Sequence, residues 1–150
     1  MGFKLDNKAQ LQKYILSQVK VFERVIIREM EILVARLENH AKDNQGHSLK
    51  PAIGYQRTGN LVNSIGGVVL KDGRVISYSG FSGDGGEEGR EFIDSILGNF
   101  GGGYVALVVA GMEYASYVEN YHNLNVLKKS QLLLPGEMNK MFEKIKAKIK

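Results

Sequence analysis

The sequence predicts an α+β domain in which a long N-terminal helix and a C-terminal helix pack on a small, mostly antiparallel sheet. Three observations predict this class: an uninterrupted helical period near the N-terminus, two strand-like runs joined by a turn, and a second helical period at the C-terminus. The chain has 150 residues, of which 43% are hydrophobic and 24% charged, so we expect one domain, 1–150, with a sizeable core.

Residues 8–42 form the clearest predicted element, a helix uninterrupted by glycine or proline. Asp6 or Asn7 is suited to cap its start, and we expect residues 43–46 to end it. At about 1.5 Å per residue, such a helix is about 50 Å long, more than one small sheet needs. The length therefore predicts a kink or packing on a neighbouring subunit. Its apolar residues are Leu11, Tyr14, Ile15, Val19, Phe22, Val25, Ile26, Leu33 and Leu37.

A short block, Arg57–Ile65, is expected to lead into the sheet. Thr58 is suited to cap a short helical turn, because a hydroxyl can accept a hydrogen bond from a free amide of the first turn. We expect Gly66 and Gly67 to end this turn. The residues expected to face inward are Leu61, Val62 and Ile65.

Two strands are expected after this block, at 68–70 and 74–78. The turn between them, 71–73, contains Asp72 and Gly73, and an Asp-Gly pair tolerates the positive φ angles of a tight hairpin. A third strand is expected at 104–110, where the nearly continuous apolar run is typical of a buried strand.

The segment 80–103 holds nine of the 18 glycines of the chain, so we expect a flexible insert that orders against neighbouring subunits. Its middle, 87–97, is expected to form a short helix with Phe92, Ile93, Ile96 and Leu97 on one side. Of these, Phe92 and Ile96 are candidate interface residues.

A second block, Gly111–Glu119, opens a short helix expected at 112–121. Tyr114, Tyr117 and Tyr121 recur at steps of three and four residues, so they fall along one side of this helix. Their rings either complete the edge of the core or form an interface stripe, because tyrosine combines apolar area with a polar tip. Glu113 and Glu119 flank the stripe and are suited to a basic neighbour.

A linker is expected at 122–133, followed by a final helix that begins near Pro135. Proline is favoured in the first turn of a helix, where its missing N–H costs nothing. The apolar residues of this helix are Met138, Met141, Phe142, Ile145 and Ile149.

The net charge of +4 is concentrated in the C-terminal helix. Residues 128–150 contain seven lysines and two glutamates, which gives +5, and the other residues sum to −1. A solvated lysine face explains this segment, and a nucleic-acid or membrane-surface contact is the alternative. No apolar run approaches the roughly 20 residues that span a bilayer, and residues 1–7 lack the apolar stretch of a secretory signal, so we expect synthesis in the cytoplasm and no membrane partner.

The sequence predicts no catalytic, metal or cofactor site. The absence of cysteine excludes disulfides, thiol catalysis and cysteine-ligated metals. The glycine-rich run 83–89 brings three carboxylates and no lysine to the place where a phosphate loop needs positive charge. The acids of the insert leave a metal or hydrolytic site as an alternative, although the helix dipole also accounts for them. These acids are Asp84, Glu87, Glu88, Glu91 and Asp94.

The two blocks resemble the HK97 gp10-like family of phage tail-component proteins, whose members carry a T-G-x-L-x-x-S-I block and, roughly fifty residues later, a Y-A-x-Y-V-E block. The matching residues here are Thr58, Gly59, Leu61, Ser64, Ile65, Tyr114, Ala115, Tyr117, Val118 and Glu119. The chain departs from the family after Glu119, where it has Asn120–Leu127 in place of a glycine, a threonine and a proline- and aromatic-rich stretch.

The resemblance implies a non-enzymatic structural protein of a tailed phage or prophage particle, without cofactors. Its expected place is the neck or tail end of the virion, in head–tail joining or tail completion, after synthesis in the bacterial host cytoplasm. Its expected partners are copies of itself, in a ring, and other phage neck or tail proteins. The alternative function is a nucleic-acid-binding module that uses the lysine-rich C-terminal helix.

Overall fold

The computed structural model describes residues 7–47, 59–113, 115–116 and 127–149, and it confirms the α+β class. All structural statements below refer to these residues. In chain order the elements are α1 (Lys8–His47), α2 (Asn60–Asn63), β1 (Ile65–Lys71), β2 (Arg74–Gly80), α3 (Gly86–Ile96), a 3₁₀ turn (Leu97–Asn99), β3 (Tyr104–Ala110) and α5 (Lys128–Ile149).

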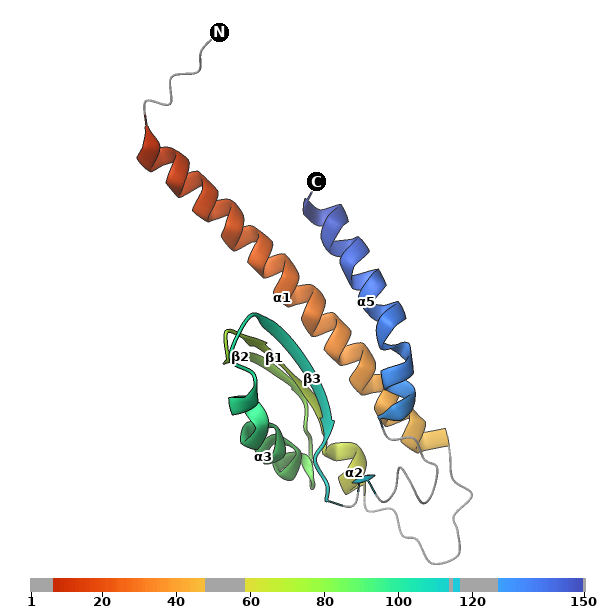
Figure 1. Ribbon diagram of the computed structural model, residues 1–150. Coiled ribbons are helices and arrows are strands. Elements are labelled where there is room, and N and C mark those ends of the chain that lie inside the picture. The colour runs from red at the N-terminus through yellow and green to blue at the C-terminus, as the bar shows by residue number, and fades with distance from the viewer. Residues whose placement is uncertain (1–6, 48–58, 114, 117–126, 150) are drawn as a thin grey trace, which may run out of the picture.

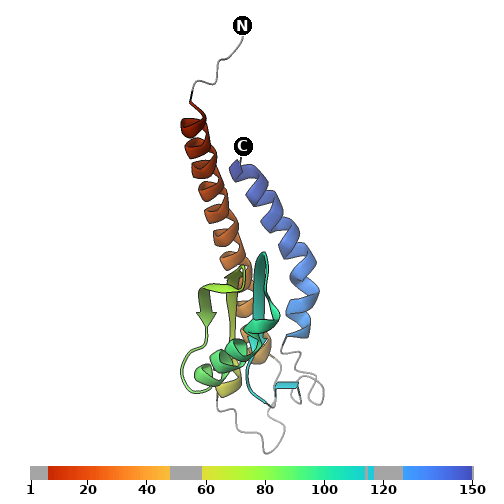
Figure 2. The ribbon, with the colours of Figure 1, turned by 60° about the vertical axis from the view of Figure 1, so that its left-hand side comes forward.

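The described elements form three layers (Figure 1). The sheet has three antiparallel strands in the order β2-β1-β3. Helices α1 and α5 lie on one side of it, and α3 lies on the other, as Figure 2 shows from a second direction. The central strand β1 is therefore covered on both faces.

Strand β1 is buried along almost its whole length because its alternate side chains enter two different clusters. Val69 packs with Met30 and Val34 of α1. Val68 packs on the other face, in the same cluster as Ile93 of α3. Successive side chains of a strand point to opposite faces, so a strand with two covered faces needs apolar residues at every position.

The predicted hairpin is confirmed, with longer strands than expected. Asp72 and Gly73 have φ angles of 51° and 74°, as a type I′ turn requires. The prediction that Gly66 and Gly67 end the preceding helical turn is wrong, since both lie within β1. A Cβ on Gly67 would lie 2.3 Å from Cγ1 of Val34, so this glycine lets α1 pack directly on the strand.

The predicted strand at 104–110 is confirmed as β3, but it lies at an edge of the sheet and only Val109 is buried. The apolar run therefore belongs to an edge strand whose two faces are both partly covered. The predicted short helix in the glycine-rich insert is also confirmed as α3, and its Ile93 is fully buried against the sheet.

Helix α5 begins at Lys128, so the predicted linker to residue 133 and the predicted start at Pro135 are wrong. Pro135 lies inside the helix, a position that costs about 3 kcal/mol for proline. Ser130, in the first turn of α5, is buried and shares a hydrogen bond of 3.0 Å between its Oγ and Nδ1 of His40.

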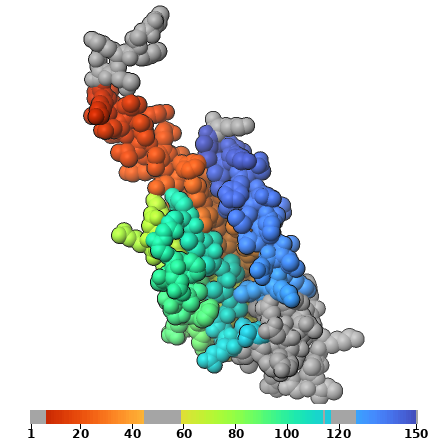
Figure 3. Space-filling view, in the orientation of Figure 1, coloured from red at the N-terminus to blue at the C-terminus, as the bar shows by residue number. Residues whose placement is uncertain are grey.

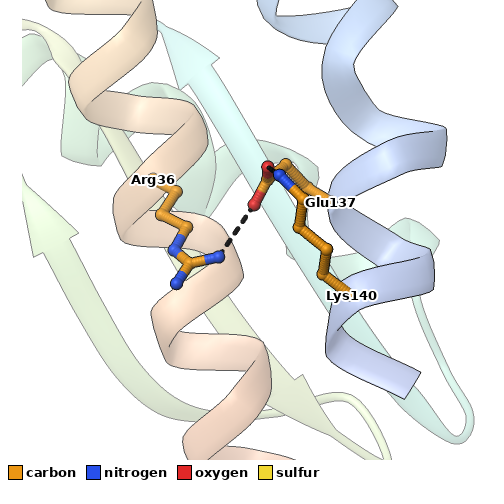
Figure 4. Close-up of polar contacts among 3 residues, drawn as sticks. All are labelled: Arg36, Glu137 and Lys140. Atoms are coloured by element: carbon orange, nitrogen blue, oxygen red, sulfur yellow. Dashed lines mark hydrogen bonds and ion pairs between the residues drawn. The ribbon is translucent and has the colours of Figure 1, made fainter. Parts of the chain in front are cut away.

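Charged contacts also join α5 to α1. The Glu137 carboxylate accepts hydrogen bonds from Arg36 Nη1 at 3.0 Å and from Lys140 Nζ at 2.6 Å (Figure 4). Nearer the C-terminus, Lys148 Nζ donates to the buried Glu29 at 2.5 Å. The two helices therefore run antiparallel, with the C-terminus of α5 near the middle of α1.

Helix α1 is continuous to His47, so the predicted end at residues 43–46 is wrong. Contacts between side chains four residues apart support its last turns. Lys42 Nζ donates to Glu38 at 2.7 Å, and Asn44 and His40 share a hydrogen bond of 3.2 Å.

Candidate self-association surface

The two sequence blocks meet in space and act as a joint of the fold. The backbone N–H of Gly111 donates to the carbonyl of Ser64 at 3.2 Å, and Ile65 lies opposite Ala110 in the β1–β3 ladder. Three block residues share one core cluster with Ala41 of α1: Leu61, Ile65 and Ala115. The described parts of the blocks therefore hold β1, β3 and α1 together.

Close backbone packing extends this joint to α3. A Cβ on Gly111 would lie 2.2 Å from the Cα of Gly89, and a Cβ on Gly89 would lie 2.4 Å from the carbonyl oxygen of Ser64. These positions accept only glycine without movement of the backbone. The described residues of the two blocks therefore have structural roles in this joint.

The first block is described from Gly59 onward. Gly59, with φ of 80°, stands at the N-cap position of α2 and has no side chain to act as a cap. The Ser64 hydroxyl donates to the carbonyl of Leu61 at 2.9 Å. Thr58, Tyr114 and Val118 lie outside the described residues.

The predicted interface residues divide into two groups. Tyr117, Glu119 and Tyr121, together with Tyr114, lie outside the described residues. Phe92 is described and is 45% exposed on α3, whereas Ile96 is half-buried and packs against the core cluster of Ile93. Their contacts with a neighbour stay predictions.

Half of the 14 large apolar side chains that are exposed in the described part of the chain lie in the N-terminal part of α1, residues Lys8–Phe22, which we call the N-terminal arm. Lys71 Nζ donates to Glu23 at 2.6 Å where the tip of the hairpin meets the helix. Beyond this point the helix projects past the sheet and α5 (Figures 1 and 3), for about 22 Å at the usual rise per residue. Every residue of the arm is exposed.

The arm carries large apolar side chains, each at least 40% exposed: Leu11, Tyr14, Ile15, Leu16, Val19, Val21 and Phe22. Burying one such side chain completely stabilises a protein by about 1.5–3 kcal/mol. Covering the arm would therefore contribute a large favourable free energy. Exposed apolar surface of this kind is common at sites of protein–protein or membrane contact.

Four of the apolar residues of the arm belong to a stripe that continues into the core. Its members recur at steps of four, four and three residues: Leu11, Ile15, Val19, Phe22, Ile26, Met30, Leu33 and Leu37. This spacing stays close to the period of a straight α-helix, so the stripe keeps to one side. Its second half packs on the sheet and α5, and its first half has no cover among the described residues.

Polar contacts near α3 are structural ties. The Tyr78 hydroxyl donates to Asp94 at 2.5 Å, and the guanidinium of Arg90 lies 4.4 Å from the centre of the Tyr78 ring. Burial and the hydrogen bond to Asp94 raise the pKa of Tyr78, so the phenol stays protonated at neutral pH. These contacts fasten α3 to β2.

The described residues include one apolar pocket of about 270 Å³ between α1, β3 and α5, whose polar lining consists of Ser130 and Gln131. No acid or base lines it. Among the described residues, no group of three or more histidine, aspartate or glutamate side chains is placed to hold a metal ion. No helix in the described ranges has the length and apolar character needed to cross a membrane.

Comparisons with family models, with curated proteins and with solved structures gave no match to this chain.

Proposed function

We propose that this chain is a structural protein of a tailed phage or prophage particle, acting at the neck or tail end in head–tail joining or tail completion. It assembles with copies of itself into a ring and contacts other neck or tail proteins. The observation that carries the proposal is the exposed apolar face of the N-terminal arm, Lys8–Phe22. The resemblance of the two blocks to phage tail-component proteins supports the kind of particle.

The arm favours assembly because it continues the stripe that builds the core. The stripe residues Met30, Leu33 and Leu37 are buried in the core. The stripe residues on the N-terminal side of Glu23 are exposed. A helix that is longer than its own sheet needs a further surface to cover it. Another protein chain supplies such a surface in an assembly.

The nucleic-acid alternative has less support from the described contacts. Three lysines of α5 are paired with glutamates: Lys140 with Glu137, Lys146 with Glu143, and Lys148 with Glu29. Ion pairing lowers the positive charge that these lysines offer to phosphates. Part of the positive charge near the C-terminus is therefore engaged in ion pairs within α5 and between α5 and α1.

A deletion and complementation experiment tests the proposed function in the phage or prophage that encodes the chain. Deleting the gene is expected to leave heads and tails that are not joined or tails that are incomplete, seen by electron microscopy. Supplying the wild-type chain restores infectious particles, and the arm variant Ile15→Gln/Val19→Gln/Phe22→Gln does not. Complete particles without the chain would contradict the proposal.

A matched control uses polar residues on the other side of the arm. Gln10→Ala/Ser17→Ala changes exposed positions outside the stripe and is expected to restore particles as well as the wild type. Loss of complementation by this control would mean that any change in the arm is disruptive, which would remove the specific role of the apolar face.

A further inference from the structure

An acidic hollow lies on α3, on the opposite side of the sheet from the arm. Its volume is about 410 Å³, and its lining comes from α3 and from the chain just after β3: Glu88, Glu91, Phe92, Gly111, Met112 and Glu113. The three carboxylates are on exposed residues and make no ion pair within the described part of the chain. Phe92 and Met112 give the hollow an apolar component, so it combines negative charge with apolar surface.

The N-terminal arm has the complementary character. It contains Lys8, Lys13 and Lys20 and no acidic residue, so its charge is +3. Its apolar stripe matches the apolar component of the hollow, and its lysines match the three carboxylates. Complementary charges of this kind fix the register and the choice of partner at an interface.

Two arms are poorly suited to pair with each other, because both carry only positive charges. Helix α5 is also a poor acceptor for the arm, since its exposed charges include a large excess of lysine. The hollow on α3 therefore offers the arm the better electrostatic match.

The arm cannot occupy the hollow of its own chain. Helix α1 covers one face of the sheet and α3 covers the other, and the arm projects beyond the end of the sheet (Figures 1 and 2). The arm and the hollow are therefore two different surfaces of one molecule. Contacts between two different surfaces are heterologous, and they generate a ring when the rotation closes.

We propose that the N-terminal arm of one copy docks in the acidic hollow of the next copy, which gives a head-to-tail assembly. This inference rests on the self-assembly in the proposed function and names the two surfaces that meet. Lysines of the arm lie against Glu88, Glu91 and Glu113, and its apolar side chains cover Phe92 and Met112 of the neighbour. Glu113 is one of the two glutamates for which the sequence already predicts a basic neighbour.

Charge reversal in separate copies tests the inference. The arm-reversed chain carries Lys13→Glu/Lys20→Glu, and the hollow-reversed chain carries Glu88→Lys/Glu91→Lys. Each alone is expected to associate more weakly than wild type by on the order of 100-fold, because like charges then face each other. Mass is measured by sedimentation over a range of concentrations, with circular dichroism melting to verify that each variant is folded.

The decisive sample is an equimolar mixture of the two reversed chains. The reversed arm of one then matches the reversed hollow of the other, and the wild-type arm and hollow also match, so oligomers are expected to return. A single chain that carries all four substitutions is expected to assemble for the same reason. A control with Lys129→Glu/Lys144→Glu changes exposed lysines of α5 and is expected to assemble like wild type.

Three outcomes would overturn the inference in distinguishable ways. If both reversed variants form oligomers as the wild type does, the arm and the hollow do not meet in the assembly, and the proposed function still stands. A wild-type chain that stays monomeric at every concentration would remove self-assembly itself. A monomeric chain whose arm binds vesicles of anionic lipid, with binding lost in the arm-reversed variant, would assign the arm to a membrane surface.

Discussion

Glu137 is one of the residues through which the two long helices meet by charge. Its carboxylate accepts from Arg36 on α1 and from Lys140 on its own helix (Figure 4). The hydrogen bonds from Lys140 and Arg36 lower the pKa of Glu137 below its usual value, because both favour the ionised form. The stability that this contact gives to the packing of α5 on α1 therefore depends on pH.

Substitution of this carboxylate is expected to have a pH-dependent effect. Because the folded pKa is lower than the unfolded one, the stability that Glu137 contributes is present above the unfolded pKa and is lost as pH falls through the folded pKa. Glu137→Gln should lower Tm at pH 7, with a difference from wild type that shrinks below the ordinary range of glutamate. A difference that stays constant with pH would contradict this account.

Glu143→Gln is the matched control for this substitution. The Glu143 side chain is 73% exposed and pairs with Lys146 one turn along the same helix. Exposed pairs of this kind contribute little, so its Tm is expected to follow the wild type at all pH values.

Gly111 is the residue at which the second block meets α3. Gly111→Ala is expected to destabilise the fold by about 1–3 kcal/mol, because the new methyl group would overlap the backbone of Gly89. Gly136→Ala is the comparison: Gly136 lies in α5 with open space around its Cα, and alanine there is expected to stabilise by about 0.5–1 kcal/mol. Denaturant unfolding measures both, and equal effects would contradict the packing described.

At the scale of elements, local sequence signals predict α1, the Asp72-Gly73 hairpin and α3, because each depends on periodicity or turn chemistry within a few residues. The start of α5 could not be predicted in this way. Pro135 is a strong local signal for a helix start, and it is outweighed by the buried Ser130 and its bond to His40. That contact joins residues far apart in the chain, so no local pattern reports it.

The stripe on α1 also contains a boundary that the sequence does not predict. Its spacing is alike in the arm and in the core half, so the sequence predicts one amphipathic helix without the boundary near Glu23. The boundary depends on where the hairpin ends, at Lys71, and thus on tertiary structure. Helix length was the signal that pointed to a contact beyond the domain.

Equal substitutions in the two halves of the stripe are expected to have unequal effects on stability. Leu33→Ala should cost about 2–5 kcal/mol, since Leu33 is buried in the core. Ile15→Ala, in the arm, should change the monomer by about 0.5 kcal/mol or less, because surface positions have small effects. Unfolding is measured at a concentration low enough for monomers, and a large loss for Ile15→Ala would show that the arm belongs to the folding core.

At the scale of the whole molecule, the chain has a basic apolar arm at one end and an acidic hollow on the other side of its sheet. The resemblance of the blocks predicts a self-assembling phage protein, and the predicted tyrosine stripe lies wholly outside the described residues. The arm and the hollow could not be predicted from sequence as partners. Their pairing depends on which faces of the sheet α1 and α3 cover, and that is a property of the assembled fold.

Light scattering across a range of concentrations tests most directly whether this chain assembles with itself through the N-terminal arm. The wild-type mass is expected to rise from 16.7 kDa to a fixed multiple of that value, as a closed ring requires. The variant Ile15→Gln/Val19→Gln/Phe22→Gln is expected to stay at the monomer mass with an unchanged circular dichroism spectrum. A wild-type chain that remains at 16.7 kDa at the highest concentration, or an arm variant that assembles like wild type, would contradict the claim.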